Sequence, residues 1–156
     1  MHNTTEHAIR TILVGQSGGP TAAINASLAG VVRAAHAHGL RVLGMRNGIQ
    51  GFLDGNVIDL VEALELEVSE LETTKQAPTN SGEKNLQLLR KTPSSWLGSC
   101  RFKLPELADN LESAAISPIY QQIDAQLKKY QVDAVLYIGG NDSMDTTDKL
   151  SRYFAQ

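Results

Sequence analysis

Residues 11–27 read TILVGQSGGPTAAINAS and combine an apolar run, a glycine turn and the start of a helical pattern. The pattern consists of apolar residues at three- and four-residue spacing, namely Ala23, Ile24, Leu28, Val31, Val32 and Ala35. A strand that passes through glycines into a helix places backbone N–H groups at the positive end of the helix dipole. The stretch therefore predicts an α/β fold with an anion site, suited to phosphate, at its first turn.

Four residues give this turn its expected properties. Gly18 and Gly19 allow the backbone to approach a ligand that a Cβ atom would keep away. Pro20 removes one donor and stiffens the turn, and Thr21 is expected to cap the helix. Because the spacing matches neither GxGxxG nor GxxxxGK(S/T), an ordinary strand-to-helix turn is the alternative.

A second strand is predicted at residues 40–45, after Gly39 has ended the helix. This strand–helix–strand unit favours a parallel, right-handed crossover. Residues 46–55 are rich in glycine and are expected to form a loop at the carboxyl end of the second strand. Residues 57–71 alternate apolar and acidic side chains, which fits either short strands or a helix.

The middle of the chain alternates between loops and short helical patterns. Residues 77–82 are a loop by composition, and residues 83–91 predict a short helix with two buried leucines. Residues 92–103 form a second loop, in which Trp96 is expected to pack and pin the loop rather than to hold a ligand. Ser117 and Pro118 predict the start of a further helix, whose buried stripe comprises Ile119, Ile123, Leu127 and Tyr130.

A second strand–turn–helix unit ends the sequence. Residues 132–138 predict a central buried strand, and Gly139-Gly140-Asn141-Asp142-Ser143 follows at once. The last helix is expected from about residue 143 to residue 154, with Met144, Leu150 and Phe154 facing inward. The whole pattern predicts a parallel sheet with helices on both faces.

Composition narrows the expected partners and setting. The 156 residues carry a net charge of -3 with acids and bases interspersed, so neither nucleic acid nor a membrane surface is expected as a partner. No apolar run approaches the ~20 residues of a membrane helix. The single cysteine, Cys100, fits a reducing cytoplasm and is expected to be a partly buried apolar residue. Residues 1–9 are expected to be a disordered or non-native tail, and residues 10–156 a single domain.

Two glycine turns, at residues 14–22 and 137–144, are expected on the same carboxyl edge of the sheet, where both can face one ligand. Arg101 follows three small residues and either presents its guanidinium to phosphoryl oxygens or is a solvated surface group.

The residues after the second turn carry oxygen atoms. Asn141 and Asp142 suit Mg²⁺ that is held together with substrate phosphates. Ser143 either caps the last helix or donates to a phosphate oxygen. Simple helix capping is the alternative for both Asp142 and Ser143.

Four motifs occur in an order that one enzyme family shares. They are Ser17-Gly18-Gly19 with Asn25, Arg46-Asn47-Gly48-Ile49-Gln50-Gly51, Gly98-Ser99-Cys100-Arg101 and Gly139-Gly140-Asn141-Asp142-Ser143. In this order they resemble the phosphofructokinases over about residues 10–156. Each motif alone is weak, whereas all four in order are specific.

The resemblance implies a Rossmann-like three-layer fold and a role for each matched residue. Gly18 and Gly19 match the glycine loop that binds the transferable phosphates. Arg101 matches the catalytic arginine that contacts the transferring phosphoryl group. Gly140, Asp142 and Ser143 match the second turn of the phosphate-donor site.

Asp142 implies pyrophosphate as the phosphate donor. The ATP-using members of the family carry Gly-Gly-Asp-Gly-Ser at the second turn, and the pyrophosphate-using members have an aspartate at the fourth position, where Asp142 stands. Asn141 departs from the aspartate that serves Mg²⁺ in most members, and is interpreted as a variant of that metal ligand. Pro20 departs from the aspartate of many ATP-dependent members.

The implied reaction is phosphoryl transfer from pyrophosphate to the 1-hydroxyl of fructose 6-phosphate with Mg²⁺, in a homo-oligomeric enzyme of glycolysis. The family's Thr-Ile-Asp-x-Asp segment, which carries the catalytic base, does not occur in this sequence. The chain is therefore expected to be an amino-terminal fragment of the donor domain, inactive by itself. The alternatives are an ATP-dependent phosphofructokinase, a related lipid or NAD kinase, and a non-catalytic phosphate- or nucleotide-binding module.

Overall fold

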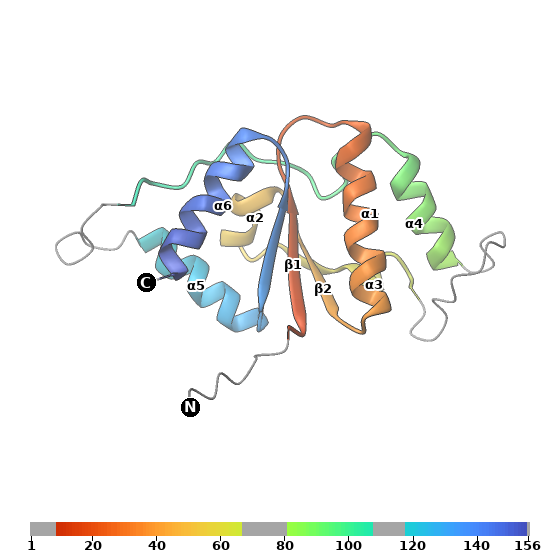
Figure 1. Ribbon diagram of the computed structural model, residues 1–156, viewed down its shortest axis with the longest axis horizontal. Coiled ribbons are helices and arrows are strands. Elements are labelled where there is room, and N and C mark those ends of the chain that lie inside the picture. Colours follow the sequence, from red (N-terminus) through yellow and green to blue (C-terminus); the bar gives the residue numbers. More distant parts are fainter. Residues whose placement is uncertain (1–8, 67–80, 108–117, 156) are drawn as a thin grey trace, which may run out of the picture.

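The computed structural model describes residues 9–66, 81–107 and 118–155. These residues form one four-stranded sheet and the helices that pack on it (Figure 1). The strand order is β3-β2-β1-β4. The strands are β1 (Thr11–Gln16), β2 (Arg41–Met45), β3 (Val57–Asp59) and β4 (Ala134–Ile138). The helices are α1 (Ala22–Ala37), α2 (Gly48–Leu53), α3 (Leu60–Ala63), α4 (Ser81–Lys91), α5 (Pro118–Tyr130) and α6 (Asn141–Phe154).

The sheet is parallel at its centre and antiparallel at one edge. β1 pairs in parallel with both β2 and β4, and the parallel arrangement predicted for the first two strands is confirmed. β3 pairs antiparallel with β2. The predicted parallel sheet is therefore confirmed for β2, β1 and β4, and β3 departs from it.

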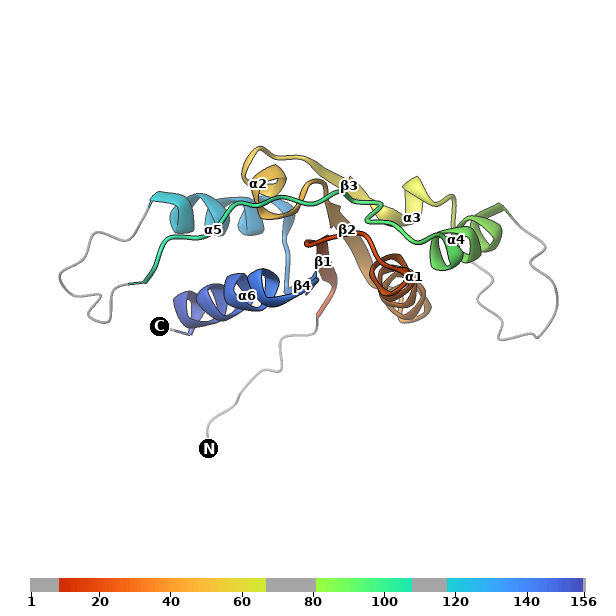
Figure 2. The same cartoon turned by 90° about the horizontal axis from the view of Figure 1, so that it is seen from above.

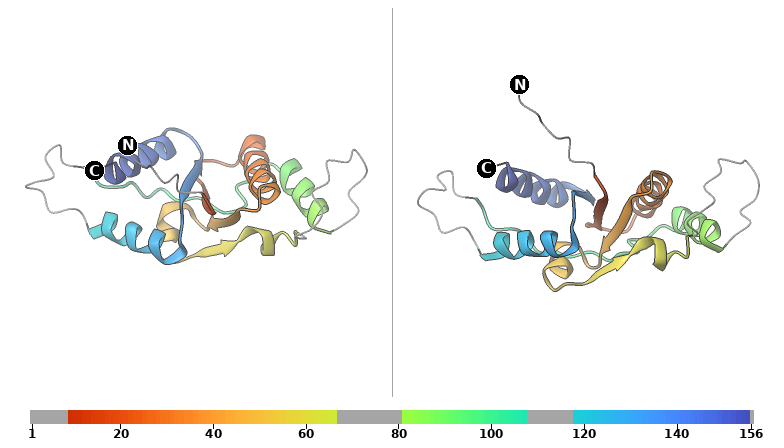
Figure 3. Two further views of the ribbon diagram at one scale, coloured as in Figure 1. Left: turned by 60° about the horizontal axis from the view of Figure 1, so that its bottom comes forward. Right: turned by 90° about the horizontal axis from the view of Figure 1, so that it is seen from below.

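Two apolar clusters lie on the two faces of the sheet. Val14 of β1 packs with residues of α1, α3 and α4, whereas the preceding Leu13 packs with residues of α2, α5 and α6. The views from above and from below show α1 and α4 on one side and α5 and α6 on the other (Figures 2 and 3). The predicted three-layer α/β architecture is confirmed.

The first helix ends as predicted but is capped differently. Gly39 adopts a positive φ of 66° after α1, which is the conformation that favours glycine there. Thr21 stands at the N-cap position of α1, but its side chain makes no capping hydrogen bond. The backbone of Thr21 instead forms an isolated antiparallel bridge with Ser94, so the prediction that Thr21 caps the helix is wrong.

The glycine-rich residues 46–55 are not a plain loop, because they contain α2. A Cβ atom on Gly51 would lie 1.7 Å from the backbone oxygen of Arg46. This glycine therefore permits a tight helical turn, not an open loop. Of residues 57–71, the described part forms β3 and α3, and residues 67–71 lie outside the described ranges.

The helices α4 and α5 follow their sequence patterns. The helix predicted at residues 83–91 begins at Ser81, and its two leucines, Leu86 and Leu89, are buried. In α5 the predicted stripe packs against the second cluster, with Ile123 fully buried and the other three members partly buried. Ser117, most of the loop predicted at residues 77–82, and residues 1–8 of the predicted tail lie outside the described residues.

β4 lies at an edge of the described sheet, so the prediction of a central buried strand is wrong for the described residues. Leu136 in this strand is 39% exposed. Val135 and Tyr137, whose side chains alternate with that of Leu136 along the strand, line a groove of about 620 Å³ together with residues of α5 and α6 that include Leu127, Leu150 and Phe154. Of the two glycine turns, only Tyr137, the first residue of the second turn, lines this groove.

The helix α6 begins at Asn141, two residues before the predicted start. Leu150 is buried as predicted, but Met144 and Phe154 are 68% and 46% exposed, so their predicted inward orientation is wrong. The buried residues of α6 are Ser143, Thr146, Lys149 and Leu150. Within the described ranges, no helix combines the length and apolar character needed to cross a membrane.

Candidate functional site

The candidate site lies at the carboxyl ends of two neighbouring strands whose following helices pack on opposite faces of the sheet. β1 and β4 are parallel neighbours, and the helices that follow them, α1 and α6, pack in the clusters on opposite faces. Because the two helices diverge, an open α/β sheet leaves a crevice for a ligand at the carboxyl ends of such a strand pair. Both glycine turns lie at this position.

The two turns touch each other. The backbone N–H of Ser17 donates to the carbonyl oxygen of Ile138 at 2.8 Å. A Cβ atom on Gly18 would lie 3.9 Å from the backbone nitrogen of Gly140. The predicted convergence of residues 14–22 and 137–144 is therefore confirmed, and the role of these turns in binding stays a prediction.

The glycines of the turns serve two different purposes. A Cβ atom on Gly139 would lie 2.0 Å from Ser143 Oγ and 2.6 Å from the backbone oxygen of Ser17, so this glycine is needed for packing. Gly19 and Gly140 are exposed, and nothing lies within 4 Å of a Cβ atom built on either. These two therefore leave open space in which a ligand can approach the backbone.

Ser143 does not cap α6. The N-cap position is Gly140, and the helix start has no side-chain capping hydrogen bond, so the capping alternative for Asp142 and Ser143 is wrong. Ser143 is 2% exposed, and its Oγ has no hydrogen-bond partner among the described residues. A buried hydroxyl with unmet hydrogen-bonding capacity therefore lies directly beneath the second turn.

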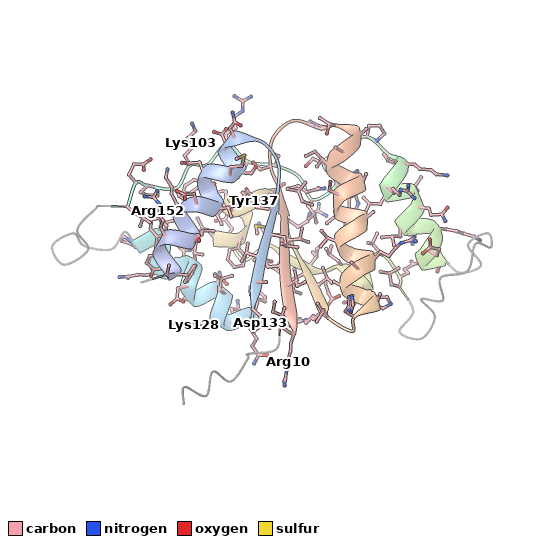
Figure 4. All side chains as sticks on the ribbon, in the orientation of Figure 1. Arg10, Lys103, Lys128, Asp133, Tyr137 and Arg152 are labelled. Atoms are coloured by element: carbon pink, nitrogen blue, oxygen red, sulfur yellow. The ribbon has the colours of Figure 1, made fainter. Side chains whose placement is uncertain are left out.

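Asp142 pairs with a lysine that sequence reasoning missed. Lys103 Nζ lies 3.5 Å from Asp142 Oδ1, and both side chains are more than 70% exposed, so the pair contributes at most about 1 kcal/mol. Figure 4 shows Lys103 at the end of the sheet where the turns lie, and Asp133 and Arg10 at the opposite end. The sequence signal that could have identified Lys103 is its position two residues after Arg101, which places a second cation on the same segment.

Asn141 and Asp142 are adjacent and exposed in the first turn of α6. Among the residues that the structure describes, no group of three or more His, Cys, Asp or Glu could hold a metal ion. Two oxygen-bearing side chains fit Mg²⁺, which keeps several waters and takes further oxygens from substrate phosphates. They do not fit a metal that requires a cage made wholly of protein ligands.

The segment that carries Arg101 and Lys103 is held at its far end by a buried lysine. Lys149 Nζ donates to the backbone oxygen of Leu104 at 3.2 Å and forms ion pairs with Glu106 and Asp145 at 2.7 and 2.9 Å. The hydrogen bonds to these two carboxylates raise the pKa of Lys149. Arg101 itself is exposed on this segment, so it is accessible to a ligand.

Cys100 packs beside Tyr137 beneath the candidate site. The Tyr137 hydroxyl accepts a hydrogen bond from Ile49 N at 3.1 Å, and burial raises its pKa to about 12. A Cβ atom on Gly48 would lie within 3 Å of both the hydroxyl and Cys100 Sγ, so this corner is closely packed. Cys100 is half-buried, which agrees with the predicted packing role.

An α/β sheet with glycine turns at its switch point defines a broad class of phosphate- and nucleotide-binding proteins. The family model described as "PFK: Phosphofructokinase" matches residues 11–156, and the chain belongs to the phosphofructokinase family. It is 36% identical over 141 residues to the "Pyrophosphate--fructose 6-phosphate 1-phosphotransferase" of Xanthomonas campestris pv. campestris, over 90% of this chain. It is 33% identical over 135 residues to the "ATP-dependent 6-phosphofructokinase" of Actinobacillus pleuropneumoniae serotype 5b, over 86% of this chain.

A solved structure agrees with these relatives. The pyrophosphate-dependent phosphofructokinase from Nitrosospira multiformis superimposes with a TM-score of 0.69 at 30% sequence identity, over 95% of this chain. The chain spans only part of the proteins it matches: 28% of the Xanthomonas relative, 32% of the Actinobacillus relative and 31% of the Nitrosospira chain.

The contrast between the two neighbouring glycines of the second turn can be measured. Gly139→Ala should lower the free energy of unfolding by about 1–3 kcal/mol, because the new Cβ atom meets the backbone of Ser17. Gly140→Ala is the matched comparison and should lower it less, by about 0.5–1 kcal/mol, because its Cβ atom meets open space and only the N-cap preference for glycine over alanine is lost. Urea unfolding of both variants decides, and equal losses would show that the turns do not pack as described.

Tyr137 should make stability depend on alkaline pH. Its folded pKa of about 12 lies above the ordinary value of 10.0, so the folded state holds the phenolic proton more tightly. This contribution is present below pH 10 and is lost as pH rises toward 12. Tyr137→Phe should flatten the decline in unfolding free energy over that range. Parallel declines in the wild type and Tyr137→Phe would contradict the assignment.

Proposed function

We propose that residues 10–156 form the amino-terminal part of the phosphate-donor domain of a pyrophosphate-dependent phosphofructokinase. The longer enzyme transfers a phosphoryl group from pyrophosphate to the 1-hydroxyl of fructose 6-phosphate. The observation that carries this proposal is the contact between two glycine turns at the switch point of the sheet, with Gly19 and Gly140 open to a ligand. The pyrophosphate-dependent relatives from Xanthomonas and Nitrosospira support it.

The backbone of both turns provides the cradle for the donor. Gly18, Gly19 and Gly140 precede the starts of α1 and α6, where free N–H groups and the helix dipoles favour an anion. Ser143 adds a hydroxyl with unmet hydrogen-bonding capacity beneath the second turn. A phosphate oxygen that reaches this turn gains a donor there.

The charged and polar side chains around these turns bind the phosphoryl group and the metal ion. Arg101 donates to the transferring phosphoryl group and stabilises the charge that develops on it, and Lys103 adds a second cation at the same end. Asn141 and Asp142 hold Mg²⁺ through their side-chain oxygens. When bound, the ion neutralises charge on the phosphate oxygens.

Asp142 selects pyrophosphate over ATP. Its carboxylate stands in the first turn of α6, where it occupies space and adds negative charge beside the donor. Pyrophosphate is short enough to avoid that carboxylate, whereas the inner phosphate of ATP meets it. The alternative donor is ATP, as the name of the Actinobacillus relative indicates. The alternative function is a non-catalytic module, which would bind phosphate or a nucleotide without transferring a phosphoryl group. A cytoplasmic location, a homo-oligomeric full-length enzyme and the absence of nucleic-acid and membrane partners stay predictions.

The donor site can be tested on this chain by calorimetric titration with pyrophosphate and Mg²⁺. Arg101→Ala should weaken pyrophosphate binding by about tenfold or more, because a charged hydrogen bond contributes about 1.5–3 kcal/mol. Arg90→Ala is the control, since Arg90 is exposed at the end of α4. Equal affinity in the wild type and Arg101→Ala would return Arg101 to the surface-charge interpretation.

Donor selectivity is measured by the ratio of the dissociation constants for ATP and pyrophosphate. At ~4 Å and an effective dielectric constant of ~20, two unit charges repel by about 4 kcal/mol. The pair with Lys103 offsets part of this repulsion, and a remnant of about 1.4 kcal/mol gives tenfold discrimination. Asp142→Gly should therefore lower the ratio by about tenfold. Asp142→Asn separates charge from size, because it removes the charge and keeps the volume.

Two results would contradict the donor assignment. One is a wild-type chain that prefers ATP. The other is a ratio that Asp142→Gly leaves unchanged.

A further inference from the structure

Residues 92–98 connect α4 to the segment that carries Arg101, and they lie against the first glycine turn without joining the sheet. The isolated bridge between Thr21 and Ser94 is their only ladder contact among the described residues. Two buried side-chain amides supply most of the other polar contacts that fix this segment. These are Gln16, the last residue of β1, and Asn25, in the first turns of α1.

Gln16 has no exposed surface, and both ends of its amide are paired. Its Oε1 accepts hydrogen bonds from Leu97 N at 2.8 Å and from Ser95 Oγ at 3.5 Å. Its Nε2 donates to the backbone oxygen of Ile24 and to Asn25 Oδ1, both at 3.2 Å. Gln16 therefore joins the end of β1, the start of α1 and the 92–98 segment.

Asn25 is 1% exposed and completes the same network. Its Oδ1 accepts a hydrogen bond from Trp96 N at 2.9 Å, and its Nδ2 donates to the backbone oxygen of Thr92 at 3.0 Å. Neither amide faces solvent, so neither contacts a ligand. Their shared effect is to bind one irregular backbone segment to the two ends of the first glycine turn.

Arg101 follows this anchored segment closely. The carbonyl oxygen of Leu97 accepts a hydrogen bond from Asn47 N at 2.7 Å, so Leu97 is held on both of its polar sides. Gly98 has a φ of 82°, and a Cβ atom there would lie 2.3 Å from Asn47 Oδ1, which leaves the backbone little freedom to shift. Downstream, Lys149 holds the backbone at Leu104. Only six residues, 98–103, lie between these two anchors.

We propose that Gln16 and Asn25 are positioning residues, which act through residues 92–98 to hold Arg101 at the correct distance from the first glycine turn. This inference rests on the proposed function, because it assigns Arg101 to the phosphate donor. The two amides touch neither ligand nor reacting atoms. They determine where the guanidinium lies relative to Gly18 and Gly19.

A double-mutant cycle separates positioning from stability. Gln16→Met and Asn25→Leu remove the hydrogen bonds and keep most of the side-chain volume, and each should weaken Mg²⁺-pyrophosphate binding by about five- to tenfold. In an Arg101→Ala background, the same substitutions should cause no further loss, because the group that they position is gone. Losses that multiply in that background would overturn the proposal.

Asn85→Leu is the matched control, because Asn85 Nδ2 also donates to a backbone oxygen, that of Leu64 at 3.2 Å, far from both turns. It should leave pyrophosphate affinity unchanged. Trp96 is the only tryptophan in the chain, and acrylamide quenching of its fluorescence should rise in Gln16→Met and Asn25→Leu but not in Asn85→Leu. Unchanged quenching in both Gln16→Met and Asn25→Leu would overturn the proposal.

These measurements distinguish the two inferences. If the wild-type chain binds no pyrophosphate, the proposed donor site fails, and Trp96 quenching still decides whether the amides hold the segment. If the variants do not fold, amide hydrogen exchange in the wild type decides. Protection of Trp96 N and Leu97 N equal to that of β1 is expected, and exchange at the rate of an open loop would overturn the proposal.

Discussion

The hydrogen bond from Ser17 N to the carbonyl oxygen of Ile138 ends the ladder between β1 and β4, and the candidate site depends on it. The register pairs Gln16 with Ile138, so both strands end at the same level and both turns begin side by side. A slip of one residue would displace one turn by about 3.3 Å and reverse which face each side chain occupies. The core enforces this register, because Leu13 and Val14 are buried on opposite faces.

Once the strands end together, the local chemistry divides between fixed and open positions. Neighbouring atoms occupy the space beside Gly139 where a Cβ atom would lie, whereas the corresponding space beside Gly19 and Gly140 is open. The packed glycine fixes the distance between the turns, and the open ones expose backbone donors. The cations come from a separate irregular segment, so its attachment to the sheet matters as much as the turns themselves.

The sequence predicted the features that depend on local pattern. Apolar runs followed by glycines identified β1, α1 and both turns, and family motifs pointed to Arg101 and Asp142. Features that depend on distant neighbours were missed. The exposure of Met144 and Phe154 follows from the position of α6 beside an edge strand, and no helical period reveals that position. The contacts of Lys103 and Lys149 join segments about 40 residues apart, so their partners were not visible in the sequence.

The glycines of residues 46–55 misled for a different reason, since glycine signals both loose loops and tight packing. Gly51 serves the second purpose, because a Cβ atom added to it would lie 1.7 Å from the backbone oxygen of Arg46.

The outer side of β4 has a physical consequence for the described part of the molecule. A sheet edge presents a row of peptide groups with no partner, and here an apolar groove and the exposed Leu136 lie beside that row. Lysine, proline and bulges, which protect many natural edges, do not occur within Ala134–Ile138. This side of the molecule is consequently a template for self-association, and the associated fraction should rise with protein concentration unless another surface covers it.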